Sequence, residues 1–223
     1  MSITANLTSI KSQLPEEVTL VAVSKTKPIS DLMEAYNAGQ LIFGENKIQE
    51  MVEKHEQMPK DIKWHMIGHV QRNKVKYMAS FVSLIHGVDN FKLLKEINKQ
   101  ALKHNRAINC LLQIKIASED SKFGMSRQEA QSILNSNEFS ELNNIKVTGL
   151  MGMATFTDDE SQLKREFNKL TKTFNSLKEI KTSNCDIKTI SMGMSGDYKL
   201  AIDCGSTMIR VGSSIFGARN YSN

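Results

Sequence analysis

The chain has 223 residues, of which 40% are hydrophobic and 24% are charged, and its formal net charge is +5. This composition is typical of a folded globular protein. No apolar run approaches the roughly 20 residues that a membrane-spanning helix needs, and residues 1–15 lack the basic and then apolar order of a signal peptide. We therefore expect a cytoplasmic protein that has no membrane partner.

The positive charge is spread along the chain. Lysines alternate with Glu and Asp in the helical stretches, and no sustained basic block of the kind that binds nucleic acid is present. The three cysteines, Cys110, Cys185 and Cys204, are far apart and form no CxxC pair. We therefore expect reduced thiols, with no disulfide framework, no zinc site and no nucleic-acid partner.

Apolar stretches of strand length alternate with stretches of helical periodicity along the whole chain. A short helix is expected first, at 3–13. The expected strands occupy residues 18–23, 41–46, 63–69, 82–90, 109–117, 146–155, 188–194 and the first part of 206–218. Helices are expected between them, at 30–38, 47–58, 71–81, 91–105, 126–136 and 159–180, with a helical turn at 198–202. Ser126 suits the N-cap of its helix, and Gly39 suits the end of another.

Eight strand–helix units follow one another without a Pro/Gly/Ser-rich linker, which predicts one domain over residues 1–223. Strict alternation implies a parallel sheet with crossover helices. Eight units favour a closed (β/α)8 TIM barrel of the α/β class, preceded by an extra N-terminal helix. A doubly wound open sheet is the runner-up, but its GxGxxG loop is absent. In a closed barrel the last strand lies beside the first, so we expect the two ends of the sequence to meet.

The sequence VAVSKTKP, residues 21–28, ends the first strand with two lysines. Ligands of α/β proteins bind at the carboxyl ends of the strands. Lys25 and Lys27 share one face of an extended chain, but Lys27 precedes Pro28 and belongs to the exit from the strand. Lys25 is therefore the better candidate for a functional amine, although this stretch taken alone favours an ordinary surface lysine.

Two Gly- and Ser-rich stretches end the last two strands, SMGMSGDY at 191–198 and IRVGSSIFG at 209–217. Glycine lets backbone N–H groups approach an anion, and hydroxyls donate hydrogen bonds. Many barrels hold a phosphate in these two loops, although a single cluster is weak evidence because turns use the same residues. Two clusters facing a lysine predict a phosphate-bearing aldehyde, pyridoxal 5'-phosphate, held as a Schiff base. A barrel that binds another phosphate metabolite is the plainer alternative.

Seven motifs, in order from the first strand to the last, match one known family. They are VAVSKTKP (21–28), FGENKIQE (43–50), WHMIGHVQRNK (64–74), KFGMS (122–126), GLMGMAT (149–155), SMGMSGDY (191–198) and IRVGSSIFGARNY (209–221). Together they resemble the pyridoxal-phosphate homeostasis protein family, whose barrel is similar to the amino-terminal domain of alanine racemase. The resemblance implies a single pyridoxal-phosphate-binding barrel over residues 1–223.

The resemblance also implies roles for individual residues. Lys25 would carry the cofactor as an internal aldimine, and Arg210 would meet its pyridine nitrogen. An always-charged guanidinium at that place disfavours protonation of the ring and weakens it as an electron sink. The residues implied to hold the phosphate are Ser191, Met192, Gly193, Gly212 and Ser213.

Some of these residues have a structural alternative. Asn46 matches a position near the ring hydroxyl of the cofactor, but it suits the N-cap of the next helix equally well. Arg210 alone would be explained by an ion pair on an inner barrel layer. His65, expected at the barrel mouth, would hydrogen-bond the cofactor or its surroundings, whereas His69 belongs to the following turn. Further ligands are not evident near the two histidines, so we predict no metal site.

Two functions fit the resemblance. The first is non-catalytic: the protein takes part in intracellular pyridoxal-phosphate (vitamin B6) homeostasis, holding the cofactor and releasing it or passing it transiently to apo-enzymes. The second is a pyridoxal-phosphate-dependent amino-acid racemase, which needs proton donors on opposite faces of the bound substrate.

The racemase hypothesis lacks its second base. In alanine racemase this base is a tyrosine from another domain or subunit, and a chain that ends at Asn223 leaves no room for that domain. The tyrosines of this chain would serve only if a partner presented one; they are Tyr36, Tyr77, Tyr198 and Tyr221. We therefore expect a monomeric carrier that is not an enzyme, with at most a weak racemase side activity.

Overall fold

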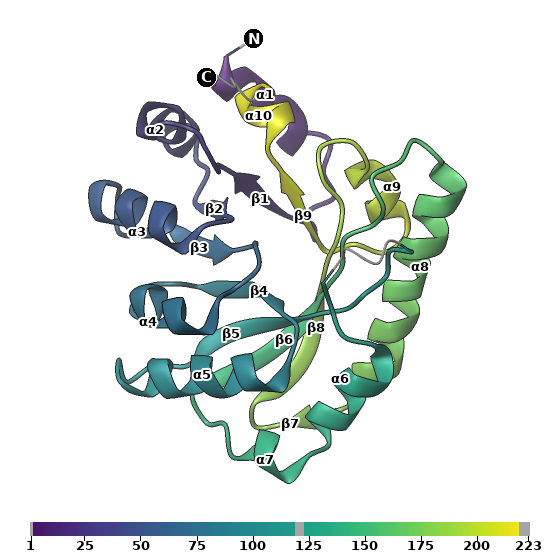
Figure 1. The fold of residues 1–223 in the computed structure, drawn as a ribbon. Coiled ribbons are helices and arrows are strands. Elements are labelled where there is room, and N and C mark those ends of the chain that lie inside the picture. The colour runs from purple at the N-terminus through teal and green to yellow at the C-terminus, as the bar shows by residue number, and fades with distance from the viewer. Residues whose placement is uncertain (1, 119–122, 219–223) are drawn as a thin grey trace.

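The structure is a computed structural model that describes residues 2–118 and 123–218. Figure 1 shows a ring of strands surrounded by helices. Within the described residues, eight parallel strands pair in the closed order β1-β2-β3-β4-β5-β6-β8-β9, and β9 returns to β1. The predicted (β/α)8 barrel with its extra N-terminal helix is thereby confirmed.

The strands are short and the helices lie between them in sequence. The parallel strands are β1 (Thr19–Val23), β2 (Ile42–Glu45), β3 (Lys63–Met66), β4 (Leu84–Val88), β5 (Ile108–Gln113), β6 (Ile145–Met151), β8 (Cys185–Ser191) and β9 (Met208–Val211). The helices are α1 (Ile3–Lys11), α2 (Ile29–Asn37), α3 (Ile48–Gln57), α4 (Val75–Met78), α5 (Phe91–Leu102), α6 (Arg127–Leu134), α7 (Asn137–Ser140), α8 (Glu160–Leu177), α9 (Tyr198–Asp203) and α10 (Ser213–Phe216). Ser126 caps α6 as predicted, within a full capping box.

Two parts of the chain differ from the expectation. The segment 71–81, predicted as one helix, is a 3-10 turn, η1 (Arg72–Lys74), followed by the short α4. Beyond α4 the amides of Phe81 and Val82 both donate to the Met78 carbonyl oxygen, at 3.1 and 2.9 Å. An additional strand, β7 (Lys181–Thr182), pairs antiparallel with the start of β8 and stands outside the parallel series.

Alternate side chains of the barrel strands enter two separate cores. The outward-facing side chains pack beneath the helices, where Phe43 and Trp64 are fully buried with ring centroids 6.0 Å apart. The inward-facing ones form a smaller apolar cluster, consisting of Val21, Val23, Ile67, Leu84, Leu111, Met151 and Met208. The inner cluster is small because buried polar side chains share the barrel interior.

The two ends of the described chain meet, as closure of the barrel requires. α1 lies beside α10 (Figure 1), and the Asn6 side-chain amide donates to the Ile215 carbonyl oxygen at 3.0 Å. Leu7 and Ile10 bury the inner face of α1. Among the described residues, no helix is both long enough and apolar enough to cross a membrane.

Candidate functional site

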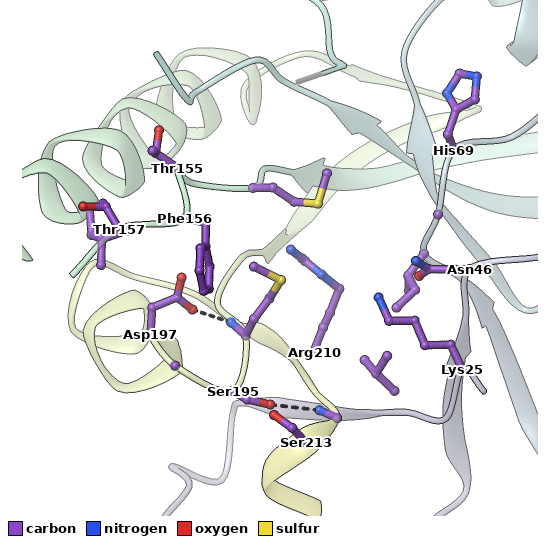
Figure 2. A pocket seen from close by; sticks show the side chains of 18 of the residues that line it. Lys25, Asn46, His69, Thr155, Phe156, Thr157, Ser195, Asp197, Arg210 and Ser213 are labelled. Carbon is purple, nitrogen blue, oxygen red and sulfur yellow. Dashed lines mark hydrogen bonds between the residues drawn. The ribbon is translucent and has the colours of Figure 1, made fainter. Parts of the chain in front are cut away.

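A cavity of about 650 Å³ lies at the carboxyl ends of the strands. Its size falls within the roughly 300–1,000 Å³ that is usual for small-molecule sites. The lining residues end or follow β1, β2, β3, β5, β6, β8 and β9, so most of the barrel contributes to the cavity. Figure 2 shows Lys25 and Arg210 extending into this space, with Phe156 to one side and Asn46 and His69 to the other.

Lys25 lies just beyond the end of β1, in a turn closed by a hydrogen bond from Lys27 N to Ser24 O, at 3.1 Å. Lys27 also borders the cavity, but its ammonium donates to the carbonyl oxygens of Phe216 (2.8 Å) and Ala218 (3.1 Å), at the end of α10. Lys27 therefore ties the first loop to the last helix. Lys25, the lysine preferred from the sequence, extends into the cavity itself.

Arg210 stands on β9 and is 4% exposed, yet it borders the cavity. Its guanidinium donates from Nη1 to Ser191 Oγ at 2.6 Å and from Nη2 to the Gly152 carbonyl oxygen at 3.1 Å. Burial lowers the pKa of Arg210 to about 10, and the charge of Asp197 acts in the opposite direction. Arg210 thus stays a cation at neutral pH, with its head group fixed on two sides.

The hydrogen bonds behind Arg210 continue across the barrel interior as a relay of three side chains, Ser191, His86 and His65. Ser191 Oγ lies 3.0 Å from His86 Nδ1, and His86 Nε2 lies 3.1 Å from His65 Nδ1. The guanidinium donates to Ser191 Oγ, and the donor in each contact of His86 is set by which of its ring nitrogens carries the hydrogen. Burial lowers the pKa of His65 to about 3 and that of His86 well below its usual value, with Arg210 adding to the shift at His86. Both rings are therefore neutral at physiological pH.

The loops after β8 and β9 are joined to each other at the cavity wall. Ser195 Oγ, after β8, accepts from Gly212 N, after β9, at 3.1 Å. Within the loop after β8, the Asp197 carboxylate accepts from Met194 N at 2.5 Å; Figure 2 marks both bonds. Burial raises the pKa of Asp197. Because Ser195 Oγ accepts from the backbone, its own hydrogen remains to be donated into the cavity.

This pair of loops has the character of an anion cradle. Among the described residues, no backbone carbonyl accepts a hydrogen bond from the N–H groups of Ser195 and Gly196. A Cβ on Gly196 would meet nothing within 4 Å, so the backbone there faces open space. Gly193 has φ +94°, and a Cβ on it would lie 2.6 Å from the Ala201 Cβ, so only glycine fits this close turn.

Of the residues predicted for the site, those that line the cavity are Lys25, Asn46, Arg210, Gly212 and Ser213. The others, His65, Ser191, Met192 and Gly193, do not line it. Ser191 and His65 point into the barrel beneath the cavity, within the relay, and Met192 belongs to the outer core. The cavity wall that follows β8 is formed instead by Met194, Ser195, Gly196 and Asp197.

The structure excludes the N-cap interpretation of Asn46 and places His69 in the expected turn. Lys47, not Asn46, is the N-cap of α3, and no side chain caps that helix. His69 follows β3, as predicted, where its ring stacks on Phe123 with centroids 4.4 Å apart and its Nδ1 lies 3.4 Å from an Asp89 oxygen. Among the described residues, no group of three or more His, Cys, Asp or Glu side chains is arranged to hold a metal ion.

The chain is similar in sequence to proteins of one known family. Residues 1–220 match the family described as alanine racemase, N-terminal domain. A "Pyridoxal phosphate homeostasis protein" of Haemophilus influenzae is 40% identical over 208 residues, which span 92% of this chain and 86% of that protein. A protein of the same name from Escherichia coli K12 is 38% identical over 212 residues, or 93% of this chain and 88% of that protein.

Solved structures give the same result for the fold. PipY of Synechococcus elongatus, solved with pyridoxal phosphate bound, has a TM-score of 0.88 and 32% identity, and the match covers 97% of this chain and all of PipY. Alanine racemase of E. faecalis shares the fold at a TM-score of 0.74 and 17% identity, with 99% of this chain matched to 59% of that enzyme. The chain therefore belongs to the pyridoxal phosphate homeostasis protein family, within the wider alanine racemase N-terminal domain family.

Proposed function

We propose that this chain binds pyridoxal 5'-phosphate and takes part in cellular pyridoxal-phosphate homeostasis as a carrier. The observation that carries the proposal is one cavity in which Lys25 and Arg210 extend beside two loops that present backbone N–H groups and hydroxyls. An amine, an anion cradle and a fixed cation are the groups that an aromatic aldehyde bearing a phosphate requires. The name of the Haemophilus influenzae relative and the ligand of PipY support the same ligand.

The residues present fit this cofactor. Ser195, Gly196 and Ser213 would hold the phosphate through N–H and O–H donors, since the cradle is open to the cavity. Lys25 would hold the aldehyde end covalently through Nζ, and Arg210 would face the ring nitrogen. When bound, the cofactor supplies an electrophilic carbon and an electron sink. Arg210 weakens that sink, because a guanidinium cannot take a proton and disfavours one on the ring.

A carrier is favoured over a racemase by what surrounds the cavity. A racemase needs a second proton donor opposite the lysine. Among the described residues no tyrosine borders the cavity: the Tyr36 hydroxyl is 3.0 Å from Asp61, Tyr77 is exposed, and Tyr198 lies on α9. Tyr221, the fourth candidate, lies outside the described residues. We further propose a cytoplasmic monomer that hands its cofactor to apo-enzymes by transient contact.

An absorbance titration with pyridoxal 5'-phosphate tests the proposal. Covalent attachment to an amine gives a band at the violet edge of the visible spectrum, and Lys25→Ala should lack it while Lys27→Ala, whose ammonium is held by α10 carbonyl oxygens, should keep it. Protein that stays colourless with added cofactor would overturn the binding proposal. Incorporation of solvent deuterium at Cα of amino acids at enzymic rates would overturn the carrier role in favour of the racemase.

A further inference from the structure

A cluster of three charged side chains lies behind the turn that carries Lys25. Lys54 Nζ on α3 is 2.8 Å from Glu45 Oε1 at the end of β2 and 2.7 Å from Glu50 Oε1 one helical turn earlier on α3. Lys54 is 5% exposed and Glu45 is fully buried. Burial raises the pKa of Glu45, and the nearby Lys54 ammonium opposes that shift. None of the three residues borders the cavity.

Each member of this cluster also binds the chain immediately beside Lys25. The Ser24 hydroxyl donates to Glu45 Oε1 at 2.6 Å, and Lys54 Nζ donates to the Ser24 carbonyl oxygen at 2.8 Å. On the other side of Lys25, the Thr26 amide donates to Glu50 Oε1 at 2.5 Å. The cluster thus holds the residue before Lys25 and the residue after it.

The turn needs this support because Thr26 has an unfavourable backbone conformation. Its φ is +63°, in the left-handed region that a β-branched residue rarely adopts. Such a residue persists only where its surroundings determine its conformation. Two bonds do so: Lys27 N to Ser24 O closes the turn, and Thr26 N donates to Glu50, which is itself held by Lys54.

We propose that Glu45, Glu50 and Lys54 are positioning residues for Lys25: they hold the main chain on both sides of it so that its side chain extends into the cavity. The inference rests on the proposed function, in which Lys25 takes up the aldehyde. Stability alone is a poor explanation, because buried ion pairs contribute little net stability compared with apolar side chains of the same size. Glu45 Oε2 has no hydrogen-bond partner among the described residues, which is a further cost of keeping the cluster. A displacement of about 1 Å at a reacting group can slow its reaction by about 100-fold.

The first test uses the protein without cofactor, so that it does not depend on the proposed function. Glu50→Gln keeps an oxygen that can accept from Thr26, and Glu50→Ala removes it. Glu53→Ala, on the exposed face of the same helix, is the matched control. Amide hydrogen exchange, followed residue by residue by NMR, should show Thr26 protected in the wild type, Glu50→Gln and Glu53→Ala, and exchanging at least tenfold faster in Glu50→Ala.

The second test measures the rate at which Lys25 takes up pyridoxal 5'-phosphate. We expect a loss of tenfold or more in Glu50→Ala, and rates within about threefold of the wild type in Glu50→Gln and Glu53→Ala. If Glu50→Ala does not fold, Ser24→Ala, which removes only one hydroxyl, should slow uptake while Thr26 stays protected. Wild-type uptake in the variants that lose these bonds would overturn the inference, as would unchanged Thr26 protection in Glu50→Ala. A wild type that takes up no cofactor would instead overturn the proposed function, and the exchange experiment would still test the contact.

Discussion

Two buried polar networks support the cavity, and they are built in opposite ways. The network behind Lys25 consists of three charges from one short segment, Glu45, Glu50 and Lys54, and it binds two main-chain groups and the Ser24 hydroxyl beside Lys25. The relay behind Arg210 consists of neutral side chains from β3, β4 and β8 and binds one guanidinium. In the proposed function Lys25 bonds covalently to the cofactor, which requires that its main chain be fixed. Arg210, proposed to face the ring, requires a fixed guanidinium, and the relay holds that end of its side chain.

The largest expected effect follows from breaking the charged network. Lys54→Met should lower the free energy of unfolding by about 3–5 kcal/mol, because it leaves two carboxylates, one fully buried, without their cation. Urea unfolding measures the change, with the exposed Lys103→Met as the control. A loss below about 1 kcal/mol would show that the two carboxylates do not depend on Lys54 for their charge balance.

Breaking the neutral relay should cost less. Ser191→Ala leaves Arg210 Nη1 and His86 Nδ1 without their partner and should lower the free energy of unfolding by about 1–3 kcal/mol. It should also weaken pyridoxal-phosphate binding, since the guanidinium loses one of its two supports. Ser206→Ala removes another buried hydroxyl, outside the relay, and should leave binding unchanged. Equal pyridoxal-phosphate affinities in the two variants would show that the relay does not support binding.

Acid should act on the relay through its histidines. Unfolded histidine takes up a proton near pH 6.5, whereas folded His65 stays neutral to about pH 3, so the unfolded chain binds more protons between these values. Stability should therefore fall as the pH drops below 6.5, by about 1.4 kcal/mol per pH unit for each histidine. The charge of Lys63 opposes protonation of His65, and that of Arg210 opposes protonation of His86. The raised pKa of Glu45 has the opposite effect on stability, because folded Glu45 takes up its proton at a higher pH than the unfolded residue does.

Urea unfolding between pH 5 and 7 measures this slope. His86→Phe should flatten it by about 1.4 kcal/mol per pH unit, since one buried ring that titrates only in the unfolded chain is gone, and the exposed His104→Gln should leave it unchanged. The same slope in His86→Phe as in the wild type would contradict neutral buried rings.

The smallest effect concerns neither network. Phe156 is 94% exposed at the edge of the cavity, and in Figure 2 it lies to one side of the space into which Arg210 extends. Phe156→Ala should weaken pyridoxal-phosphate affinity by about two- to tenfold, through loss of one aromatic contact. Tyr77→Ala removes an exposed aromatic ring outside the cavity and should leave affinity unchanged. Equal affinities in the two variants would exclude a contact by Phe156.

The barrel could be predicted from the sequence because apolar runs of strand length alternate regularly with stretches of helical spacing. The position of Lys25 at the cavity could be predicted for the same reason, since VAVSKTKP places it just after β1 ends. The stretch 191–193 was harder, because Gly and Ser mark a loop without showing which residue is the last to point into the barrel. Ser191 is that residue, and the cavity wall begins with Met194.

The two networks were missed for different reasons. His86 lies in the apolar run of β4, and its partners His65 and Ser191 are 21 and 105 residues away, so no local pattern joins them. Inward parity with Leu84 was the available signal. Glu50 and Lys54 stand four apart, which predicts an ordinary helix-surface pair. Their contact with the Lys25 turn arises only when β2 pairs beside β1.

Reduction of the cofactor-loaded protein with borohydride, followed by peptide mass spectrometry, tests the central claim most directly. If Lys25 holds the aldehyde and the loops after β8 and β9 hold the phosphate, each chain should carry one pyridoxyl-phosphate group, attached to Lys25. Attachment mainly to Lys27 or to surface lysines, or recovery of unmodified Lys25 from coloured protein, would contradict the account.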